Sequence, residues 1–323
     1  MREWPAEQRY RALEQCRCAF TNVSQYINPT KFLWRQLFPG IQAADGTPLK
    51  TDPPKKTTQK KWVTVKNYDG DRTLLCIGEE EESDYVILYF HGNAEYAAKK
   101  CDFFGRLARH LKAIVVAVEY PGYNKEPGNR TPEEITDVAV NALVKTKELY
   151  PHKKFIVMGF SIGTGPTAVL ASEVDNIHAC ILHAPYRSLP EIVMTFIDYE
   201  MSRIVELGFQ KSVADSMAAR VLSGAVLRLP KHVWATRDNA TRFKCPLLVL
   251  HAEHDEIVPY AHGSDVYDAA KNAANEEEDV KIHTQEAGVM HNVETHEEEK
   301  NIFIPVADFL KSIKKRQKKR QKR

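Results

Sequence analysis

The sequence predicts an α/β protein in which helices cover both faces of a mostly parallel sheet. Short apolar runs of about six residues recur along the chain, and such runs are typical of strands that are buried on both faces. Helical patterns alternate with these runs, which favours parallel strands joined by crossover helices. The length of 323 residues allows one large α/β domain or two average ones, and 43% hydrophobic with 27% charged residues is ordinary for a globular protein with a wettable surface.

The predicted strands begin with an antiparallel pair. WVTVKN and RTLLCI, within residues 62–77, alternate apolar and polar residues on either side of a turn. Six further strands follow as YVILYF (85–90), AIVVAVEY (113–120), FIVMGF (155–160), ACILHA (179–184), PLLVLHA (246–252) and VKIHTQ (280–285). The clearest helix spans residues 131–151, because Thr131 can cap it, Glu134 completes a capping box and a proline ends it.

The composition divides the chain into three parts. We expect an N-terminal arm over residues 1–60, an α/β domain over residues 61–310 and a basic tail over residues 311–323. No window approaches eighteen consecutive apolar residues, the first fifteen residues lack the apolar core of a signal peptide, and the six cysteines lack disulfide-framework spacing. These features predict a cytoplasmic protein without a membrane-spanning helix.

Residues 185–245 interrupt the alternation of strands and helices. They contain no strand pattern before the run that starts at Pro246, and we expect a helical insertion there, placed before the loop EHDEIVPY at residues 253–260. One predicted helix in the insertion bears an apolar face, with Met217, Val221 and Leu222 on it. The insertion either packs on the sheet or forms a lid that supplies an apolar substrate groove, and both readings stay open.

The stretch FIVMGFSIGTG, residues 155–165, predicts a catalytic serine. A buried strand runs into Ser161 and a helical pattern follows it, so the serine sits on a tight strand-to-helix corner. Gly159 and Gly163 lack the Cβ atoms that would clash in such a corner. The alternative is an ordinary structural turn, since G-x-S-x-G alone is a weak motif.

A serine nucleophile needs a base and an acid that orients the base. In open α/β sheets, reacting groups gather at the carboxyl ends of the strands, and two loops at such ends offer Asp255 and His291. The rivals, which we expect to be surface charges, are Glu253, Glu256 and His296. The resulting order Ser161, Asp255, His291 is that of α/β-hydrolases, so we expect their eight-stranded, mostly parallel sheet.

The loop after the strand at residues 85–90 predicts the oxyanion hole. A His-Gly pair in YFHGNAEYA lets the backbone turn sharply toward the serine. We expect one main-chain N–H from Asn93 or Ala94 and a second from Ile162, which follows the nucleophile.

Six motifs in order resemble the alpha/beta hydrolase domain-containing protein 17 family over roughly residues 60–310: LYFHGNAE, EYPGYNKEPG, GFSIGTGPTAVLAS, LHAP, PLLVLHAEHDEIVP and MHNVE. The resemblance implies a membrane-associated thioesterase that removes palmitate from protein cysteines, with Ser161, Asp255 and His291 as its triad. The sequence departs from the family at Asn124, where a glycine is usual, and before the base, where Met290 is expected to line the pocket. The family's N-terminal cysteine cluster is absent, with only Cys16 and Cys18 nearby.

Other activities are weighed against this one. His251 and His254 suggest a metal hydrolase, but no H-E-x-x-H helix and no early G-x-G-x-x-G are present, so we expect neither a metal nor a dinucleotide cofactor. A carboxylesterase, a lipase-like enzyme or a serine peptidase fits the same triad. A non-catalytic binding module on the same scaffold is the alternative outside enzymes.

The last thirteen residues, KSIKKRQKKRQKR, carry nine Lys or Arg and no acid, so the rest of the +2 chain has a net charge of −7. Val306, Phe309, Leu310 and Ile313 form the last apolar stripe, so the basic run is expected to project from the domain. Three readings stay open: a solubilising tail, a nucleic-acid or nuclear-import patch, and an anchor to anionic membranes that palmitoylated Cys16 or Cys18 would complete.

Overall fold

The computed structural model describes residues 60–67, 70–93, 95–124, 126, 128–129, 131–195, 233–274 and 276–322. Several predicted features lie outside these ranges: the arm up to residue 59, Ala94, Cys16, Cys18, and the part of the helical insertion that carries Met217, Val221 and Leu222. No helix in the described ranges has the length and apolar character needed to cross a membrane.

Eight strands form one sheet in the order β1-β2-β4-β3-β5-β6-β7-β8. Their bounds are β1 (Lys60–Asn67), β2 (Gly70–Ile77), β3 (Tyr85–Phe90), β4 (Ala113–Val118), β5 (Lys154–Phe160), β6 (Ala179–His183), β7 (Leu247–Ala252) and β8 (Val280–Gln285). The strands from β3 onward pair in parallel, whereas β2 pairs antiparallel with both β1 and β4. The predicted antiparallel pair and the mostly parallel sheet are therefore confirmed.

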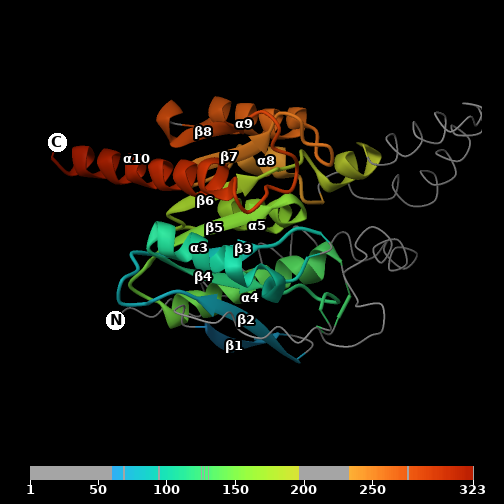
Figure 1. Ribbon diagram of the computed structural model, residues 1–323, viewed down its shortest axis with the longest axis vertical. Coiled ribbons are helices and arrows are strands. Elements are labelled where there is room, and N and C mark those ends of the chain that lie inside the picture. The colour runs from blue at the N-terminus through green and yellow to red at the C-terminus, as the bar shows by residue number, and fades with distance from the viewer. Residues whose placement is uncertain are drawn as a thin grey trace, which may run out of the picture.

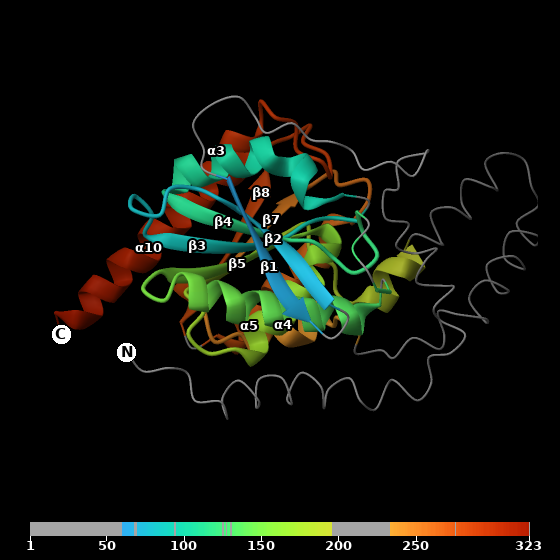
Figure 2. The same cartoon turned by 90° about the horizontal axis from the view of Figure 1, so that it is seen from below.

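Helices cover both faces of the sheet (Figures 1 and 2). The helices are α3 (Cys101–Leu111), α4 (Pro132–Leu149), α5 (Thr164–Glu173), α8 (Thr236–Ala240), α9 (Tyr260–Ala273) and α10 (Ile304–Gln321), with short turns η2 (Ala97–Lys100), η3 (Ser161–Gly163), η5 (Glu277–Asp279) and η6 (Glu299–Phe303). Thr131 caps α4 by accepting a hydrogen bond from the Glu134 N–H at 3.2 Å, as the sequence predicts.

Two hydrophobic cores result from the alternation of side chains along the strands. In β3, Val86 and Leu88 point into the core under α4, α5 and α9, while Ile87 and Tyr89 point into the core under α3 and α10. All six β3 side chains are buried, which is what its continuous apolar run indicates. The sheet is thus held rigid from both sides, and its carboxyl edge can position reactive groups.

The basic segment at the end of the chain continues α10, and the last turns of this helix extend past the sheet in Figures 1 and 2. The predicted apolar stripe is confirmed, since Val306, Phe309, Leu310 and Ile313 are all buried. Beyond it, Arg316 forms an ion pair with Asp279 at 2.8 Å, and Arg320 forms one with Glu276. These pairs link the side of the helix to residues that directly precede β8.

Candidate active site

Ser161 lies at the corner between β5 and α5, in the turn η3. Its φ is +52°, a left-handed conformation that costs a residue with a Cβ about 1–3 kcal/mol. A Cβ at Gly159 would overlap the carbonyl oxygen of Gly163, and one at Gly163 would overlap that of Phe90. The two glycines therefore permit the corner, as predicted, and the corner presents the serine hydroxyl at the carboxyl edge of the sheet.

His291 and Asp255 form a buried hydrogen-bonded pair beside that edge. The Nδ1 atom of His291 lies 2.8 Å from Asp255 Oδ2 and 3.0 Å from Oδ1. Because an ionised carboxylate only accepts hydrogen bonds, Nδ1 carries the proton and Nε2 keeps its lone pair. His291 can therefore act as a base through Nε2, the atom turned away from Asp255.

The surroundings of Asp255 keep its carboxylate ionised. Burial raises the pKa of Asp255, but hydrogen bonds from His251 and His291 and from the Val258 N–H outweigh burial, so the pKa lies well below the ordinary value. The main-chain N–H groups of Ile257 and Val258 donate to Oδ1 at 2.8 and 2.7 Å. A permanently charged acid is what the orienting role requires.

The rivals for acid and base lie at the surface. Glu253 is exposed, and the side chain of His296 is 76% exposed and next to Glu294. Glu256 is also exposed, yet its carboxylate accepts a hydrogen bond from the main-chain N–H of His291 at 2.9 Å. The sequence predicts Glu256 to be a surface charge of the loop, and in the structure this residue also binds the main chain of His291.

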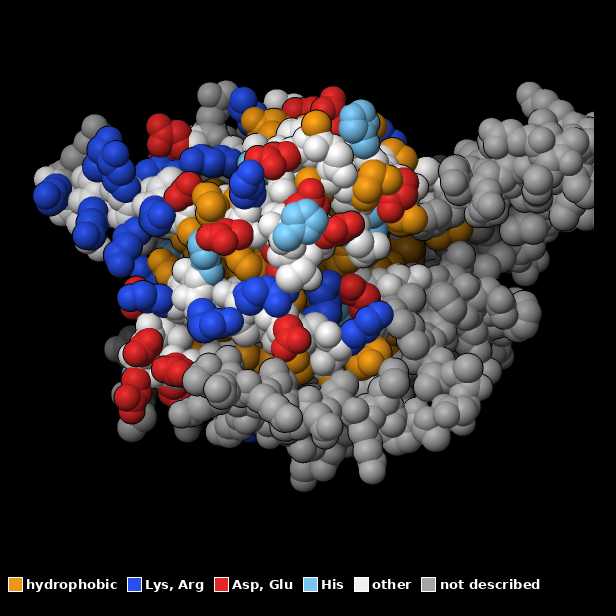
Figure 3. Space-filling model, viewed as in Figure 1, with side chains coloured by type: hydrophobic (Ala, Val, Ile, Leu, Met, Phe, Trp, Pro, Cys, Tyr) orange, Lys and Arg blue, Asp and Glu red, His pale blue; other side chains and the backbone are white. Residues whose placement is uncertain are grey.

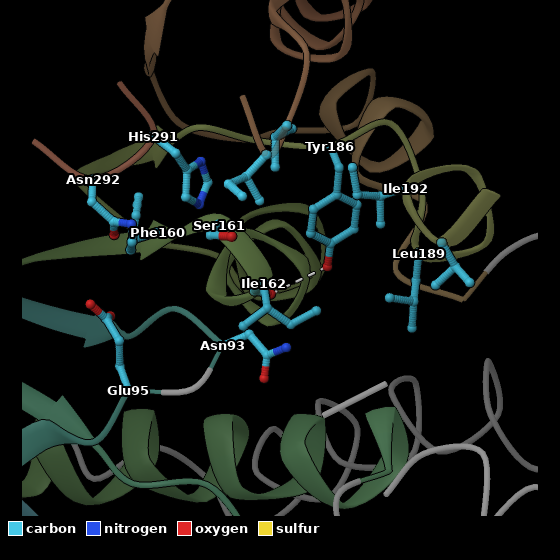
Figure 4. Close-up of a pocket in the computed structure, with 13 residues that line it drawn as sticks. Asn93, Glu95, Phe160, Ser161, Ile162, Tyr186, Leu189, Ile192, His291 and Asn292 are labelled. Carbon is cyan, nitrogen blue, oxygen red and sulfur yellow. Dashed lines mark hydrogen bonds between the residues drawn. The ribbon is translucent and has the colours of Figure 1, made fainter. Parts of the chain in front are cut away.

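Ser161 and His291 line one cavity of about 280 Å³. Figure 4 shows the His291 ring directed toward Ser161, and the ring centroid lies 4.9 Å from that of Phe160. No hydrogen bond joins the Ser161 hydroxyl to His291 among the described residues. Such contacts often form only when substrate is bound, so the arrangement is compatible with proton transfer.

The loop after β3, which carries the predicted oxyanion donor, is braced by buried polar groups. The Glu119 carboxylate lies 2.9 Å from His91 Nε2 and accepts a hydrogen bond from the Ala97 N–H at 2.9 Å. The Tyr120 hydroxyl donates to the His91 carbonyl oxygen at 2.7 Å. The EYPGY segment thus fixes the loop, a role that the sequence could not show because His91 and Glu119 lie 28 positions apart.

Asn93 and Ile162, the predicted oxyanion donors, both line the cavity that contains Ser161. The Asn93 side-chain oxygen accepts a hydrogen bond from the Tyr123 hydroxyl at 2.8 Å, which fixes the residue at the end of its loop. Ile162 lies in the first turn of η3, where main-chain N–H groups have no partner within the helix. The structure therefore brings both residues to the serine.

The cavity has an apolar side and a polar side, with Ser161 between them (Figure 4). Tyr186, Leu189 and Ile192, from the segment after β6, form the apolar side, and Glu95 and Asn292 lie on the other. The Tyr186 hydroxyl donates to the Ile162 carbonyl oxygen at 3.2 Å and so ties the apolar wall to the corner.

Met290 does not belong to the lining of this cavity, so its predicted role in the pocket is wrong. Its side chain is 44% exposed. The residues on either side of it, Val289 and His291, are both buried. The next residue along, Asn292, takes the place at the cavity that the sequence reasoning assigned to Met290.

The histidines that suggested a metal centre are not brought together. His251 is fully buried at the end of β7, and His254 is exposed. Within the described ranges, no three His, Cys, Asp or Glu side chains cluster in a way that could hold a metal ion.

His183, the last residue of β6, is buried close to His291 and Asp255. Burial and the nearby His291 lower the pKa of His183 to about 3, so its ring is neutral. The Gln285 amide nitrogen lies 3.1 Å from its Nε2 and 3.3 Å from the Asn301 carbonyl oxygen, which links the ends of β6 and β8 to η6. The neutral His183 ring is thus joined to β8 and η6 through Gln285.

Comparisons with known proteins bear on the fold. A family model described as alpha/beta hydrolase fold matches residues 85–226. Protein ABHD12B of Homo sapiens is 27% identical over 269 residues, which cover 77% of this chain and 68% of that protein. Lysophosphatidylserine lipase ABHD12 of Danio rerio is 27% identical and alpha/beta hydrolase domain-containing protein 17C of Mus musculus 25% identical, each over 59% of this chain. The chain spans about half the length of these last two relatives, at 48% and 51%.

Solved structures show the same architecture. The esterase Pf2001 of Pyrococcus furiosus superposes with a TM-score of 0.57 at 17% identity, covering 81% of this chain and 98% of its own. Acylaminoacyl peptidase of Pyrococcus horikoshii gives 0.54 at 18% identity, covering 74% of this chain and 38% of its own. At such identities the likeness shows the fold alone. The chain has an alpha/beta hydrolase fold and resembles protein 17 of that group, as its motifs predicted.

Proposed function

We propose that this alpha/beta hydrolase is a serine hydrolase that cleaves acyl esters or thioesters through Ser161, His291 and Asp255. The observation that carries the proposal is the buried His291–Asp255 hydrogen bond, which faces a serine held at φ +52° across one cavity. An ionised acid, a base with a free Nε2 and a hydroxyl at a strained corner are the parts that acyl transfer needs.

In the proposed mechanism, His291 Nε2 takes the hydroxyl proton while the Ser161 oxygen attacks the acyl carbonyl carbon. The carbonyl oxygen becomes an oxyanion, and the main-chain N–H groups of Asn93 and Ile162 stabilise it; each such donor typically contributes about 3–4 kcal/mol. His291 then passes its proton to the leaving oxygen or sulfur, which leaves Ser161 acylated. Water, deprotonated by His291, releases the acid and restores the serine.

The cavity supports an aliphatic acyl group as the substrate's apolar part. Leu189, Ile192 and Tyr186 offer it a continuous apolar wall beside Ser161, and the leaving group would lie toward Glu95 and Asn292. Met217, Val221 and Leu222 are proposed to extend this wall, and they lie outside the described residues. We propose depalmitoylation of S-acylated proteins as the activity, by analogy with protein 17.

A lipid-like ester is the second candidate substrate, and the relative named lysophosphatidylserine lipase favours it. The two candidates differ in the leaving atom, so the test uses acyl-thioester and oxygen-ester substrates with the same acyl chain. A thioesterase should show the higher kcat/KM on the thioester after correction for uncatalysed hydrolysis. Preference for the oxygen ester would assign a lipase-like or carboxylesterase activity, and turnover only of peptide bonds would assign a peptidase.

We also propose a peripheral contact between α10 and anionic membranes. Lys315, Lys318, Lys319 and Lys322 are exposed and make no ion pair in the described part of the chain, and at 100° per residue they fall on the side of α10 opposite its buried stripe. Figure 3 shows this basic surface at the free end of the helix. Each such lysine adds up to about 1 kcal/mol near an anionic leaflet.

A further inference from the structure

A fully buried histidine with no part in the proposed mechanism lies behind the acid. His251 is the second-to-last residue of β7, four positions before Asp255. Its Nε2 lies 2.8 Å from the Val258 carbonyl oxygen and 3.4 Å from Asp255 Oδ2. Since a carbonyl oxygen only accepts, Nε2 carries the proton of this ring and donates it toward the acid loop.

The contacts of His251 form a chain that ends at the base. The Nε2–H group of His251 donates a hydrogen bond to the carbonyl oxygen of Val258, and the N–H of Val258 donates to Asp255 Oδ1 at 2.7 Å. The other carboxylate oxygen, Oδ2, accepts from His291 Nδ1 at 2.8 Å and faces His251 as well. One side chain therefore contacts both the backbone that cradles the carboxylate and the oxygen that binds the base.

Among the described residues, only one nitrogen of the His251 ring, Nε2, has a hydrogen-bond partner, and that partner lies in the loop that carries Asp255. His251 Nδ1 is buried and has no hydrogen-bond partner among the residues that the structure describes. A Cβ at Gly263, in α9, would overlap that nitrogen, so the glycine makes the room that the ring occupies. A leucine would satisfy the packing of such a pocket without an unpaired nitrogen. The histidine is therefore explained by its Nε2 donor.

We propose that His251 is a positioning residue that fixes the Asp255 carboxylate for its hydrogen bond to His291. This proposal rests on the proposed function, because it assigns His251 a part in the same reaction. Among the described residues, the polar partners of His251 are Val258 and Asp255, and of these two only Val258 lines the cavity. Its loss should therefore lower kcat and leave KM, which reports on substrate binding to the cavity, nearly unchanged.

The test compares His251→Leu, which keeps the volume and removes the donor, with His251→Gln, whose amide N–H can replace Nε2–H. With a soluble p-nitrophenyl butyrate substrate, we expect kcat to fall about 10- to 100-fold in the leucine variant, with KM within about twofold of wild type. The glutamine variant should recover most of the loss. Gly263→Ala keeps the histidine but pushes on its ring, and should lower kcat in the same way if His251→Leu does not fold.

A readout that needs no turnover separates this proposal from the proposed function. The His291 Nδ1 proton, hydrogen-bonded to a carboxylate, should give a low-field NMR resonance in wild type and in His251→Gln, and a shifted or lost resonance in His251→Leu. If wild type shows the resonance but hydrolyses no ester, the proposed function fails while the positioning role still stands. Equal losses of kcat in the leucine and glutamine variants, an unchanged resonance in the leucine variant, or a loss confined to KM would overturn the role of His251.

Discussion

The Asp255 carboxylate is buried, and yet its pKa lies well below the ordinary aspartate value. Hydrogen-bond donors surround it, namely the side chains of His251 and His291 and the main-chain N–H groups of Ile257 and Val258. A group whose pKa is lower in the folded than in the unfolded protein stabilises the fold in its ionised form. That stabilisation is present above the unfolded pKa of about 3.9 and is lost as the pH falls from there toward the folded value.

Asp255→Asn should therefore cost stability in a pH-dependent way. The difference in unfolding free energy between wild type and the variant should stay constant from about pH 7 to pH 5 and shrink below about pH 4, as the unfolded wild-type carboxylate takes up its proton. Urea unfolding at each pH measures it. Asp265→Asn, which removes a carboxylate that is 42% exposed, is the control. A difference that stays constant below about pH 4, or that grows as the pH falls, would mean that the Asp255 pKa is not lowered.

The proximity of Ser161, Asp255 and His291 was predictable from the sequence because each follows an apolar run that reads as a strand, and the ends of parallel strands meet. The residues that support these three side chains were not predictable from the sequence. Glu256, which holds the His291 backbone, and Glu119, which holds His91, act through contacts between residues 35 and 28 positions apart. Met290 was misjudged because a loop gives no period from which to read which side chains face inward.

At the scale of elements, the β5–η3–α5 corner depends on the absence of two Cβ atoms. Gly159→Ala should destabilise the fold by about 3 kcal/mol or more, because the methyl group would overlap the Gly163 carbonyl and the Thr167 hydroxyl, which are both buried. Gly288→Ala is the matched control, since φ at Gly288 is +92° but a Cβ there would meet nothing within 4 Å. It should cost only about 1 kcal/mol.

Chemical denaturation of both glycine variants measures this difference. If the two variants are equally stable, overlap of the added methyl group with its neighbours is not the reason that position 159 requires a glycine.

The segment that follows β6 should set the acyl-chain preference of the enzyme. Replacing Leu189 and Ile192 with serine removes apolar wall next to Ser161, and each CH₂ of a bound chain contributes about 0.8 kcal/mol when buried. The double variant should lose activity on octanoyl esters and keep activity on acetyl esters, measured as kcat/KM across a chain-length series. Ile304→Ser, at an exposed apolar position on α10, is the control. An unchanged chain-length profile would show that the acyl group lies elsewhere.

The strands could be predicted from the sequence where burial on both faces requires a continuous apolar run, as in β3 and β5. The end of α10 could not, because its last turns bury no apolar side chain. Ion pairs of Arg316 with Asp279 and of Arg320 with Glu276 hold that stretch, and the partners' proximity arises only once β8 is in place.

At the scale of the whole molecule, the lysine face of α10 and the cavity lie at opposite edges of the sheet. Lys314 pairs with Asp84 at 3.8 Å and Arg316 with Asp279, residues that directly precede β3 and β8, whereas Ser161 follows the carboxyl end of β5. A membrane held by the lysine face would thus leave the cavity uncovered. Vesicle binding should not inhibit hydrolysis of a soluble ester.

Replacing Lys315, Lys318, Lys319 and Lys322 with glutamine should abolish salt-sensitive sedimentation with phosphatidylserine-containing vesicles and leave hydrolysis of a soluble ester unchanged. The same number of lysines replaced on other faces, at Lys99, Lys145, Lys244 and Lys300, is the control for net charge. Binding that survives the first set, or that both sets weaken equally, would rule out the lysine face as a membrane contact. Tighter binding to nucleic acid than to vesicles would assign the face to that partner.

The central claim is that Ser161 is a nucleophile activated by His291, and covalent labelling with a fluorophosphonate tests it most directly. The serine oxygen should displace fluoride from phosphorus, so intact mass should rise by one phosphonyl group, with the modification located on the peptide that contains Ser161. Labelling should vanish in Ser161→Ala and slow by orders of magnitude in His291→Ala. A folded wild-type protein that stays unlabelled, or that is labelled equally in Ser161→Ala, would contradict the account.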